Sequence, residues 1–355
     1  MQLQSCALLG LLLGGTLHLA GDVLYSVTDL GTLGGDSFGL GINDLGQVTG
    51  LSFTGPFENH AFLYSNGQMI DLGTLGGFSS FGSGINNLGQ VAITSGQQAF
   101  LYSNGQMINL GDLGGFSSFS RGINSLGQVT GGARTATVAS HAFVYSNGEM
   151  IDLGTLGGRD SFGTGINNLG QVTGQSQYLT TADQVHAFLY SNGQMIDLGT
   201  LGGFSSSGND INDLGQVTGG SSTAAGQEHA FLYSNGQMID LDTLGGTLSR
   251  GFGINNLGQV TGQYLTTADQ FLQFHAFLYS NGQMIDLNNV IDPALGVILS
   301  SAGDINNKGQ IVANSLSGRA FLLTPVPEPG TRSFLGVALL VLVASVHMSR
   351  RSGRA

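Results

Sequence analysis

The sequence predicts an all-β fold, a closed seven-bladed β-propeller of four-stranded antiparallel blades that spans residues 21–325. Three observations support this prediction: a repeat that occurs seven times, hairpins that are apolar on both faces, and chain ends that supply each other's missing strands. The composition agrees, because 60 of the 355 residues are glycine and only five are proline. Many glycines between short apolar runs are typical of an all-β protein with tight turns.

Two sequence elements alternate along the chain. The first, GIN(N/D/S)LGQVTG, occurs seven times at intervals of 38 to 51 residues, with its isoleucine at Ile42, Ile85, Ile123, Ile166, Ile211, Ile254 and Ile305. The second, HAFLYSNGQM, also occurs seven times, with its phenylalanine at Phe62, Phe100, Phe143, Phe188, Phe231, Phe277 and Phe321. Repeats of roughly 40 to 50 residues have the size of propeller blades.

Each element is predicted to form one β-hairpin. Asn66 and Gly67 tolerate the positive φ angles of a two-residue type I′ turn. Gly89 lies one position later in its element, where a type I turn with a G1 bulge needs a left-handed residue. A unit therefore has the strands SxGxGIN, QVTGxS, HAFLYS and QMIDLG. The TLGG segment then leads from the outermost strand to the innermost strand of the next blade, where crowding near the axis explains the glycines of GxGIN.

The expected pairing in the second hairpin places apolar side chains on both faces. The expected pairs are Tyr64 with Met69 and Phe62 with Asp71 on one face, and Leu63 with Ile70 and Ala61 with Leu72 on the other. A small sheet that is apolar on both faces must be covered on both. Each unit is therefore expected to lie between two neighbouring units, as propeller blades do.

The two ends of the repeat region complement each other. Residues 24–35, LYSVTDLGTLGG, match a fourth strand without the three strands before it, and residues 301–325 contain three strands without a fourth. We therefore expect the N-terminal strand to complete the last blade. An open solenoid would instead need capping repeats at its ends.

Charge and cysteine content exclude several classes of function. The net charge is −12, with only ten Lys and Arg in the whole chain, and such a surface repels a nucleic-acid backbone. The single cysteine, Cys6, lies in residues 1–20, which are predicted to be a secretory signal peptide. The exported chain would then have no disulfide, no cysteine-ligated zinc and no cysteine nucleophile. No cofactor is expected.

The last thirty residues, 326–355, form a second targeting segment. Val326, Pro327, Glu328 and Pro329 precede an apolar stretch, residues 334–348, which is followed by Arg350 and Arg351. A permanent membrane span needs about 20 residues, and a basic tail stays on the cytoplasmic side. The short span predicts a temporary anchor that an enzyme later cuts, and an ordinary single-span anchor is the alternative.

These motifs resemble two known families. The tail resembles the PEP-CTERM sorting signal of Gram-negative bacteria, and residues 22–325 resemble the HAF-type extracellular repeat family. The departures are local: Gln98 and Arg319 replace the histidine of HAF, and Asn109 replaces the aspartate of IDL. The resemblance implies secretion to the cell surface, a repeat architecture and processing by an exosortase-like membrane enzyme. It implies no reaction.

Recurring histidines and aspartates are candidates for a metal or catalytic site. They are His60, His141, His186, His229 and His275, with Asp29, Asp71, Asp152, Asp197, Asp240 and Asp286. The histidines lie on the third strand of each blade, about 10 Å outward of the innermost strand, so equivalent residues diverge and do not converge on one ion. We expect each histidine to bond to backbone or to the next blade, and the aspartates to accept turn or interblade hydrogen bonds. Calcium binding by some aspartates is a weaker alternative.

The loops between the second and third strands vary most, and repeat proteins place such variation on one face. The stretch QYLTTADQ occurs twice, and its Tyr178, Asp183, Tyr264 and Asp269 offer the aromatic rings and carboxylates that hold sugars. Strand alternation places these loops on the same face as the TLGG segments. The alternative is a neutral duplication of loop sequence.

Two functions remain open. The first is a non-enzymatic binding or structural module of the cell envelope or extracellular polymer matrix, with extracellular polysaccharide as a partner. The second is an extracellular polysaccharide hydrolase or lyase, which needs two carboxylates roughly 5 to 10 Å apart in a cleft.

Overall fold

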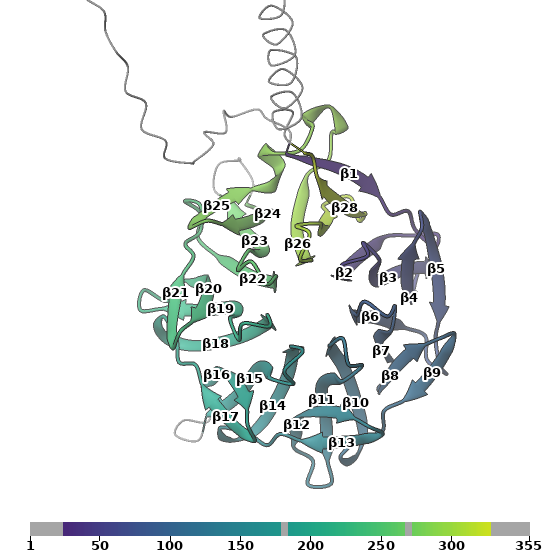
Figure 1. Cartoon of the computed structure of the whole chain (residues 1–355), viewed down its shortest axis with the longest axis vertical. Helices are drawn as coiled ribbons and strands as arrows, with labels where there is room; N and C mark the ends of the chain where they lie inside the picture. The colour runs from purple at the N-terminus through teal and green to yellow at the C-terminus, as the bar shows by residue number, and fades with distance from the viewer. Residues whose placement is uncertain (1–23, 179–183, 267–271, 328–355) are drawn as a thin grey trace, which may run out of the picture.

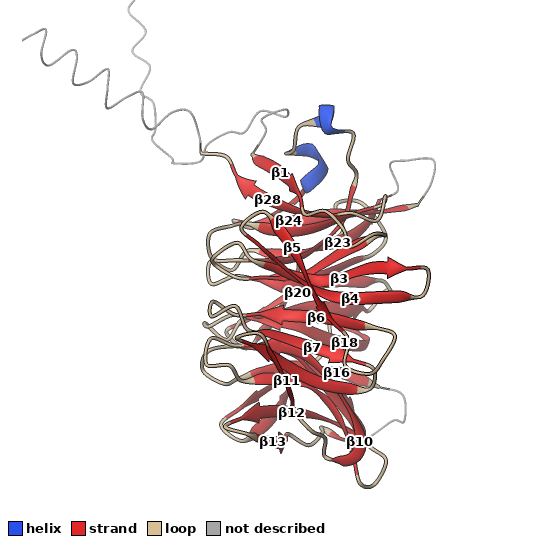
Figure 2. Ribbon diagram, turned by 90° about the vertical axis from the view of Figure 1, so that its right-hand side faces the viewer, coloured by secondary structure: helices blue, strands red, loops and turns tan. Residues whose placement is uncertain are grey.

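Seven four-stranded antiparallel sheets surround a central axis (Figure 1), as the repeat predicts. The computed structural model describes residues 24–178, 184–266 and 272–327. In the first six blades the chain runs from the innermost strand outward, so that sequence order and spatial order coincide. The side view in Figure 2 shows that the connecting loops lie at the two faces of the disc.

The strands follow the predicted order in every blade. Blade one contains β2 (Ser37–Ile42), β3 (Val48–Gly55), β4 (Glu58–Ser65) and β5 (Gln68–Gly73). Blade two contains β6 (Ser80–Ile85), β7 (Val91–Ser95), β8 (Gln98–Ser103) and β9 (Gln106–Asn109). Blade three contains β10 (Gly114–Ile123), β11 (Val129–Thr135), β12 (Ser140–Ser146) and β13 (Glu149–Asp152). Blade four contains β14 (Gly157–Ile166), β15 (Val172–Tyr178), β16 (Val185–Ser191) and β17 (Gln194–Asp197).

The remaining strands form blades five to seven. Blade five contains β18 (Gly202–Ile211), β19 (Val217–Thr223), β20 (Glu228–Ser234) and β21 (Gln237–Asp240). Blade six contains β22 (Ser249–Ile254), β23 (Val260–Thr266), β24 (Gln273–Ser280) and β25 (Gln283–Asp286). Blade seven contains β26 (Leu299–Ile305), β27 (Ile311–Ser315), β28 (Ala320–Pro325) and, as its outermost strand, β1 (Tyr25–Asp29).

Two short 3-10 helices, η1 (Leu287–Asn289) and η2 (Pro293–Leu295), lie in the connection between blades six and seven. The side chains of Asp286 and Asp292 cap their N-termini. In the part of the chain that the structure describes, no helix is long and apolar enough to cross a membrane. The apolar stretch predicted as an anchor, residues 334–348, lies outside the described residues.

Both predicted turn types are confirmed. Asn66 and Gly67 have φ angles of 52° and 80°, as a type I′ turn requires. Gly89 has a φ angle of 72°, and its N–H donates to the carbonyl of Asn86 at 3.0 Å. These turns set the pairing at the tip of each hairpin.

The predicted register of the outer hairpin is confirmed except at its end. Tyr64 pairs with Met69, Phe62 with Asp71 and Leu63 with Ile70, as expected. The predicted pairing of Ala61 with Leu72 is wrong, because Ala61 pairs with Gly73 across a register shift. The carboxylate of Asp71 accepts the N–H of Gly73 at 2.7 Å, and Gly73 has a φ of 70°, so Leu72 is an extra residue in the outer strand at this point.

Each blade packs between its two neighbours, as the two apolar faces predict. Phe62 and Tyr64 of blade one pack in one cluster with Val312 of blade seven. Leu63, on the opposite face, packs in another cluster with Ile93 of blade two. Phe62 and its equivalents in blades three to six are fully buried. Burying one such ring contributes roughly 1.5 to 3 kcal/mol.

A serine near the start of the first strand joins neighbouring blades. Ser80 of blade two accepts the N–H of Ala61 at 2.8 Å and donates to the carbonyl of Gly73 at 2.6 Å, and both partners belong to blade one. The same arrangement recurs at the next four interfaces, with Ser118, Ser161, Ser206 and Ser249. This serine therefore fixes the TLGG segment at the point where the chain enters the next blade.

The ring closes by the predicted strand exchange. β1 pairs antiparallel with β28, with Tyr25 opposite Pro325, and Figure 1 shows the first and last strands side by side. The N–H of Val326 donates to the carbonyl of Leu24 at 2.8 Å. One blade therefore contains both ends of the described chain.

Crowding at the axis explains the glycines of GxGIN. A Cβ on Gly122 would lie 2.9 Å from the carbonyl oxygen of Thr164 in the next blade. A Cβ on Gly84 would lie 3.0 Å from the carbonyl oxygen of Arg121. The innermost strands of adjacent blades therefore lie close enough together to favour glycine directly before the isoleucine of GIN. The blades that lack this glycine are exceptions.

Candidate functional site

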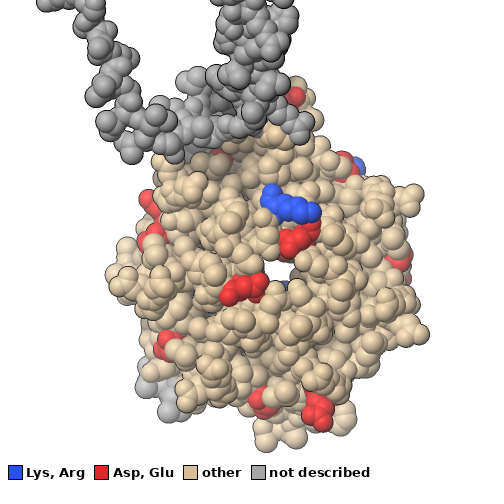
Figure 3. Space-filling view, viewed as in Figure 1, with Lys and Arg blue, Asp and Glu red and all other residues tan. Residues whose placement is uncertain are grey.

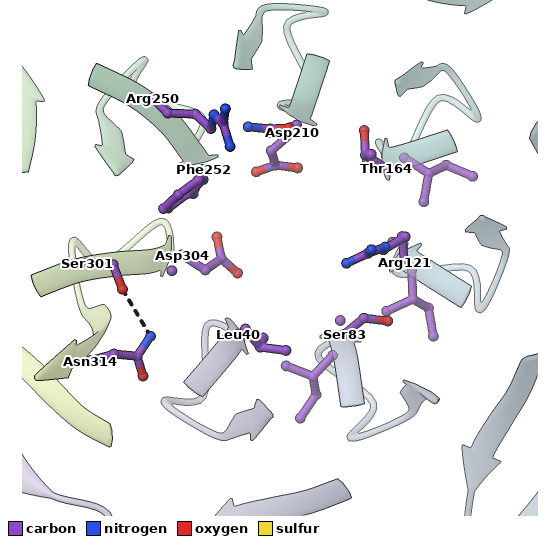
Figure 4. A pocket seen from close by; sticks show the side chains of 18 residues that line it. Leu40, Ser83, Arg121, Thr164, Asp210, Arg250, Phe252, Ser301, Asp304 and Asn314 are labelled. Carbon is purple, nitrogen blue, oxygen red and sulfur yellow. Dashed lines mark hydrogen bonds between the residues drawn. The ribbon is translucent and has the colours of Figure 1, made fainter. Parts of the chain in front are cut away.

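A channel runs along the axis, and its cavity is the candidate functional site. Figure 3 shows the opening on one face, with acidic and basic side chains at the rim. The cavity has a volume of about 430 Å³ and is formed mainly by the innermost strands. Figure 4 shows the side chains that line it. We call this space the axial cavity.

One ring of positions in the axial cavity differs in all seven blades. In each blade this position lies two residues before the isoleucine of the GIN element. The seven residues are Leu40, Ser83, Arg121, Thr164, Asn209, Phe252 and Gly303. By contrast, the asparagine after that isoleucine is the same in every blade. Within the inner strands, these varied side chains therefore face the space where a ligand would make contact.

A ring of asparagines surrounds the channel at one mouth and joins all seven blades. The side-chain amide of each asparagine donates to the backbone carbonyl of the equivalent asparagine in the next blade, at 2.8 to 3.1 Å. The ring comprises Asn43, Asn86, Asn124, Asn167, Asn212, Asn255 and Asn306. These side chains are buried, so the ring is part of the scaffold and not a free binding surface.

Two carboxylates, Asp44 and Asp213, lie at the same mouth. Burial opposes ionisation of Asp44, but hydrogen bonds from Asn87 and Asn307, together with the charge of Lys308, hold its pKa below the usual value. The pKa of Asp213 is likewise lowered by hydrogen bonds from Asn168 and Asn256 against the effect of burial. Both groups therefore present negative charge to the channel at neutral pH.

Two further aspartates project into the axial cavity. Asp210 in blade five and Asp304 in blade seven occupy the position that is glycine in the other five blades. Asp210 accepts the N–H of Ile211 at 2.8 Å and that of Ile254, in the next blade, at 2.9 Å. Asp304 makes the same two bonds, to Ile305 at 2.7 Å and to Ile42 at 3.0 Å.

The surrounding protein makes both of these acids weak. Burial raises the pKa of Asp210 to about 7, although its two backbone hydrogen bonds act in the opposite direction. Burial and then the charge of Asp210 raise the pKa of Asp304 well above the usual value. Two carboxylates that interact in this way share protons as a pair.

Arg121 brings the opposite charge to the axial cavity. Its guanidinium carbon lies 5.7 Å from the ring centroid of Phe119, in a cation–π contact. Within residues 24–178, 184–266 and 272–327 it forms neither a hydrogen bond nor an ion pair. Burial lowers its pKa, but a guanidinium remains charged at neutral pH. In contrast, the nearby Arg250 forms a bidentate pair with Glu228, at 2.8 Å for both hydrogen bonds.

The recurring histidines pair with aspartates of their own blade. Nδ1 of His60 lies 2.9 Å from the carboxylate of Asp71, and the same pair occurs in blades three to six. The predicted partner, backbone or the next blade, was wrong, because Phe62 pairs with Asp71 and places His60 diagonally across the same face. The prediction that these aspartates accept turn hydrogen bonds is confirmed at Asp71, whose carboxylate accepts from Gly73.

The two tyrosines predicted to bind sugar lie in different blades. Tyr178 is in blade four and stacks on His186, with ring centroids 5.2 Å apart. Tyr264 is in blade six, is only 6% exposed and donates its hydroxyl to Asp286 at 2.9 Å. Asp183 and Asp269 lie outside the described residues. Of the two tyrosines, Tyr178 is the one that is partly exposed.

Most of the two predicted targeting segments also lies outside the described residues. These segments are residues 1–20, together with Glu328, Pro329, Arg350 and Arg351 of the tail. Val326 and Pro327 are described and exposed at the end of β28. The loops between the second and third strands lie on the same face as the TLGG segments, as predicted. Leu156, in one TLGG segment, forms an isolated β-bridge with Tyr178 at the end of β15.

Sequence reasoning did not identify the residues of the axial cavity, although a signal was present. Five units have glycine before the isoleucine of GIN and two have Asp210 or Asp304. A charged residue at a crowded position is unusual, because it needs a hydrogen-bonding reason or a functional one. The position before it, occupied by seven different residues, gave a second signal.

Comparisons with known proteins support the fold alone. No family model matches the chain, and no curated protein matches it. Among solved structures, it resembles the β-propeller domain of the Trilobed protease from Pyrococcus furiosus, which has an open velcro topology. That match has 8% identity and a TM-score of 0.52, and covers 83% of this chain and 99% of the other.

Two further solved structures are similar at the same level. YCF48 bound to D1 peptide matches with 10% identity and a TM-score of 0.50, covering 86% of this chain and 96% of the other. The extracellular domain of the putative hybrid two component system BT4673 from B. thetaiotaomicron has the same identity and TM-score, covering 86% and 40%. These distant propellers leave the function of this chain open.

Proposed function

We propose that the protein is a secreted or surface-displayed, non-enzymatic binding module of the cell envelope or extracellular polymer matrix of a Gram-negative bacterium. Its resemblance to HAF-type repeats supports this location. So does the tail that resembles a PEP-CTERM signal, in which an exosortase-like membrane enzyme would recognise Val326 to Pro329. Residues 1–20 would direct export, and residues 334–348 would anchor the chain transiently.

The observation that carries the binding function is the ring of seven different side chains in the axial cavity. Neighbouring scaffold positions, such as the asparagine ring, are identical in all blades. A purely structural repeat protein has no reason to place Arg121, Phe252 and Leu40 at equivalent positions around one channel. A cavity with a few polar groups and an apolar wall is typical of a ligand site.

A retention experiment tests this function. The exported protein is immobilised and exposed to the extracellular polysaccharide of the producing bacterium, and bound carbohydrate is measured. We expect retention by the wild type and by Arg134→Gln, which removes an exposed charge outside the axial cavity. We expect reduced retention by Arg121→Gln. Absence of retention by the wild type would contradict a role in binding the matrix polymer.

The second candidate, a polysaccharide hydrolase or lyase, is favoured by one observation. Asp210 and Asp304 line the same cavity, and the raised pKa of Asp210 is suited to a general acid. Two carboxylates are the minimum for glycoside hydrolysis. Release of reducing ends or unsaturated sugars by the wild type, and its loss in Asp210→Asn, would establish this activity in place of simple binding.

A further inference from the structure

The axial cavity contains opposite charges that are not paired with each other. Arg121 enters from blade three, Asp210 from blade five and Asp304 from blade seven, so that the three groups face the channel from three sides (Figure 4). Arg121 and Asp304 extend from opposite sides of the opening. In the described part of the chain, no ion pair joins Arg121 to either aspartate.

Each of these groups has hydrogen-bonding capacity left over. A carboxylate has about four acceptor positions, and the backbone N–H groups occupy two at Asp210 and two at Asp304. The guanidinium of Arg121 has five N–H donors and no hydrogen-bonding partner among the residues described. The hydrogen bonds from backbone N–H groups therefore explain why the two aspartate side chains are held in place. They do not explain why Arg121 faces the aspartates.

The balance of charge restricts the ligand. Because burial and mutual repulsion raise the pKa values of Asp210 and Asp304, the pair keeps at least one proton near neutral pH and carries no more than about one negative charge. Arg121 contributes one positive charge. A simple anion would be opposed by the aspartates and a simple cation by the arginine. A molecule with both charges satisfies both sides.

The walls between the charges limit the size and shape of the ligand. Leu40 and Phe252 are the apolar members of the varied ring, and they line the same space. The volume of about 430 Å³ is at the lower end of the range for small-molecule sites, roughly 300 to 1,000 Å³. The cavity therefore accommodates a short molecule with a small apolar part.

We propose that the axial cavity binds a small zwitterion with a primary ammonium group and a carboxylate, the chemistry of an amino acid or a short peptide. The ammonium donates to Asp210 and Asp304, and the carboxylate accepts from Arg121. Leu40 and Phe252 contact the carbon skeleton between the charged ends. This inference rests on the proposed binding function and specifies the ligand class of its site.

Calorimetric titration of the wild-type exported protein tests the inference directly. The probes are glycine, 4-aminobutyrate and glycylglycine, which separate the two charges by increasing distances. Each probe is compared with its N-acetyl derivative, which lacks the ammonium, and with its amide, which lacks the carboxylate. We expect at least one zwitterion to bind about tenfold or more tightly than both of its blocked derivatives. Equal binding of a blocked derivative, or binding of none of the zwitterions, would overturn the proposal.

Variants locate the site. We expect Arg121→Gln to weaken binding of the zwitterion by about tenfold or more. Binding of the amide derivative should not change, because that probe lacks the carboxylate that Arg121 would bind. Arg134→Gln is the matched control and should bind as the wild type does. Unchanged zwitterion affinity in Arg121→Gln would overturn the assignment. The comparison of blocked probes on the wild type needs no variant, so it holds even if a substitution impairs folding.

The two proposals fail separately. If the polymer is retained but no zwitterion binds, the proposed function stands and the ligand class is wrong. If a zwitterion binds with the expected dependence on Arg121 but no polymer is retained, the axial site stands and the matrix partner is wrong.

Discussion

Nη2 of Arg319 lies 2.7 Å from Oδ2 of Asp29, and this ion pair joins the residue directly before the last strand of the propeller to the end of its first strand. Arg319 occupies the position of the HAF histidine, and Asp29 occupies that of the paired aspartate, so the closing blade retains the contact with arginine in place of histidine. In blade two both members change, to Gln98 and Asn109. The positions therefore vary together as a pair.

The closing ion pair should contribute little on its own. Both side chains are more than 40% exposed, and exposed pairs are typically worth about 1 kcal/mol or less. We expect Arg319→Gln to lower the free energy of unfolding by at most about 1 kcal/mol at low salt, with a smaller difference at 1 M salt. Urea unfolding at both salt concentrations measures this. A loss above about 3 kcal/mol would mean that the pair, and not the strand pairing, holds the ring closed.

The asparagine ring should contribute more per residue. The side chain of Asn212 is buried, donates to Asn255 and accepts the N–H groups of Leu214 and Gln216. We expect Asn212→Ala to lower the free energy of unfolding by about 2 to 4 kcal/mol, because several buried polar groups lose their partners.

A natural substitution provides the control for this ring. Blade three has the exposed Ser125 where blade six has the partly buried Asn256, at the position after the ring asparagine. We expect Asn256→Ser to cost no more than about 1 kcal/mol in the same urea unfolding experiment. Equal losses for Asn256→Ser and Asn212→Ala would argue against a special role of the buried ring.

Gly174, the glycine of QVTG in blade four, should be intolerant of a side chain, although the equivalent positions in blades two and seven are Ile93 and Ala313. A Cβ on Gly174 would overlap the carbonyl oxygen of Phe162 on the paired inner strand. We expect Gly174→Ala to destabilise the fold by about 1 to 3 kcal/mol through this overlap. Gly193→Ala is a useful comparison, since its Cβ would meet nothing within 4 Å and only its φ of 78° opposes the substitution. A thermal unfolding scan of both variants separates steric overlap from backbone strain.

Stability should depend on pH through the acids of the axial cavity. The folded-state pKa of Asp210 is about 7, above the value near 4 of an unfolded aspartate, so the folded state binds the proton more tightly. The stability that this group contributes is therefore fully present below about pH 4 and is lost as the pH rises through 7. Asp304 interacts with Asp210 and also has a raised pKa, so it adds to the same dependence.

We expect Asp210→Asn to reduce this pH dependence. The asparagine carries no charge at any pH, so the decline in the free energy of unfolding between pH 5 and pH 8 should be smaller in the variant than in the wild type. Urea unfolding at the two pH values measures the difference. Parallel declines in both proteins would show that other groups cause the pH dependence.

Much of the fold was predictable from the sequence because it depends on local signals that recur. The Asn66–Gly67 turn, the two apolar faces around Phe62 and the unpaired fourth strand at residues 25–29 each specify one step toward a closed ring. The end of the outer hairpin was not predictable, because the bond from Gly73 to Asp71 shifts the register by one residue. Periodicity carries no information about such a side-chain contact.

The axial cavity was harder to predict, because it depends on differences between repeats. Asp210 and Asp304 come together only when blades five and seven are placed around one axis, and Arg121 is 89 residues before the first of them. The loop residues Tyr178 and Tyr264 attracted attention because they recur in duplicated sequence. The structure places them two blades apart and buries Tyr264 against its own blade.

The central claim is that binding depends on the side chains that make the axial cavity asymmetric. It is tested most directly by giving this cavity the residues of blade two, in a single protein with Arg121→Ser, Asp210→Gly, Phe252→Ser and Asp304→Gly. Circular dichroism first establishes that the β-fold is retained. Calorimetric titration then compares its zwitterion binding with that of the wild type. We predict a folded propeller with no measurable binding, whereas wild-type affinity in this variant would contradict the account.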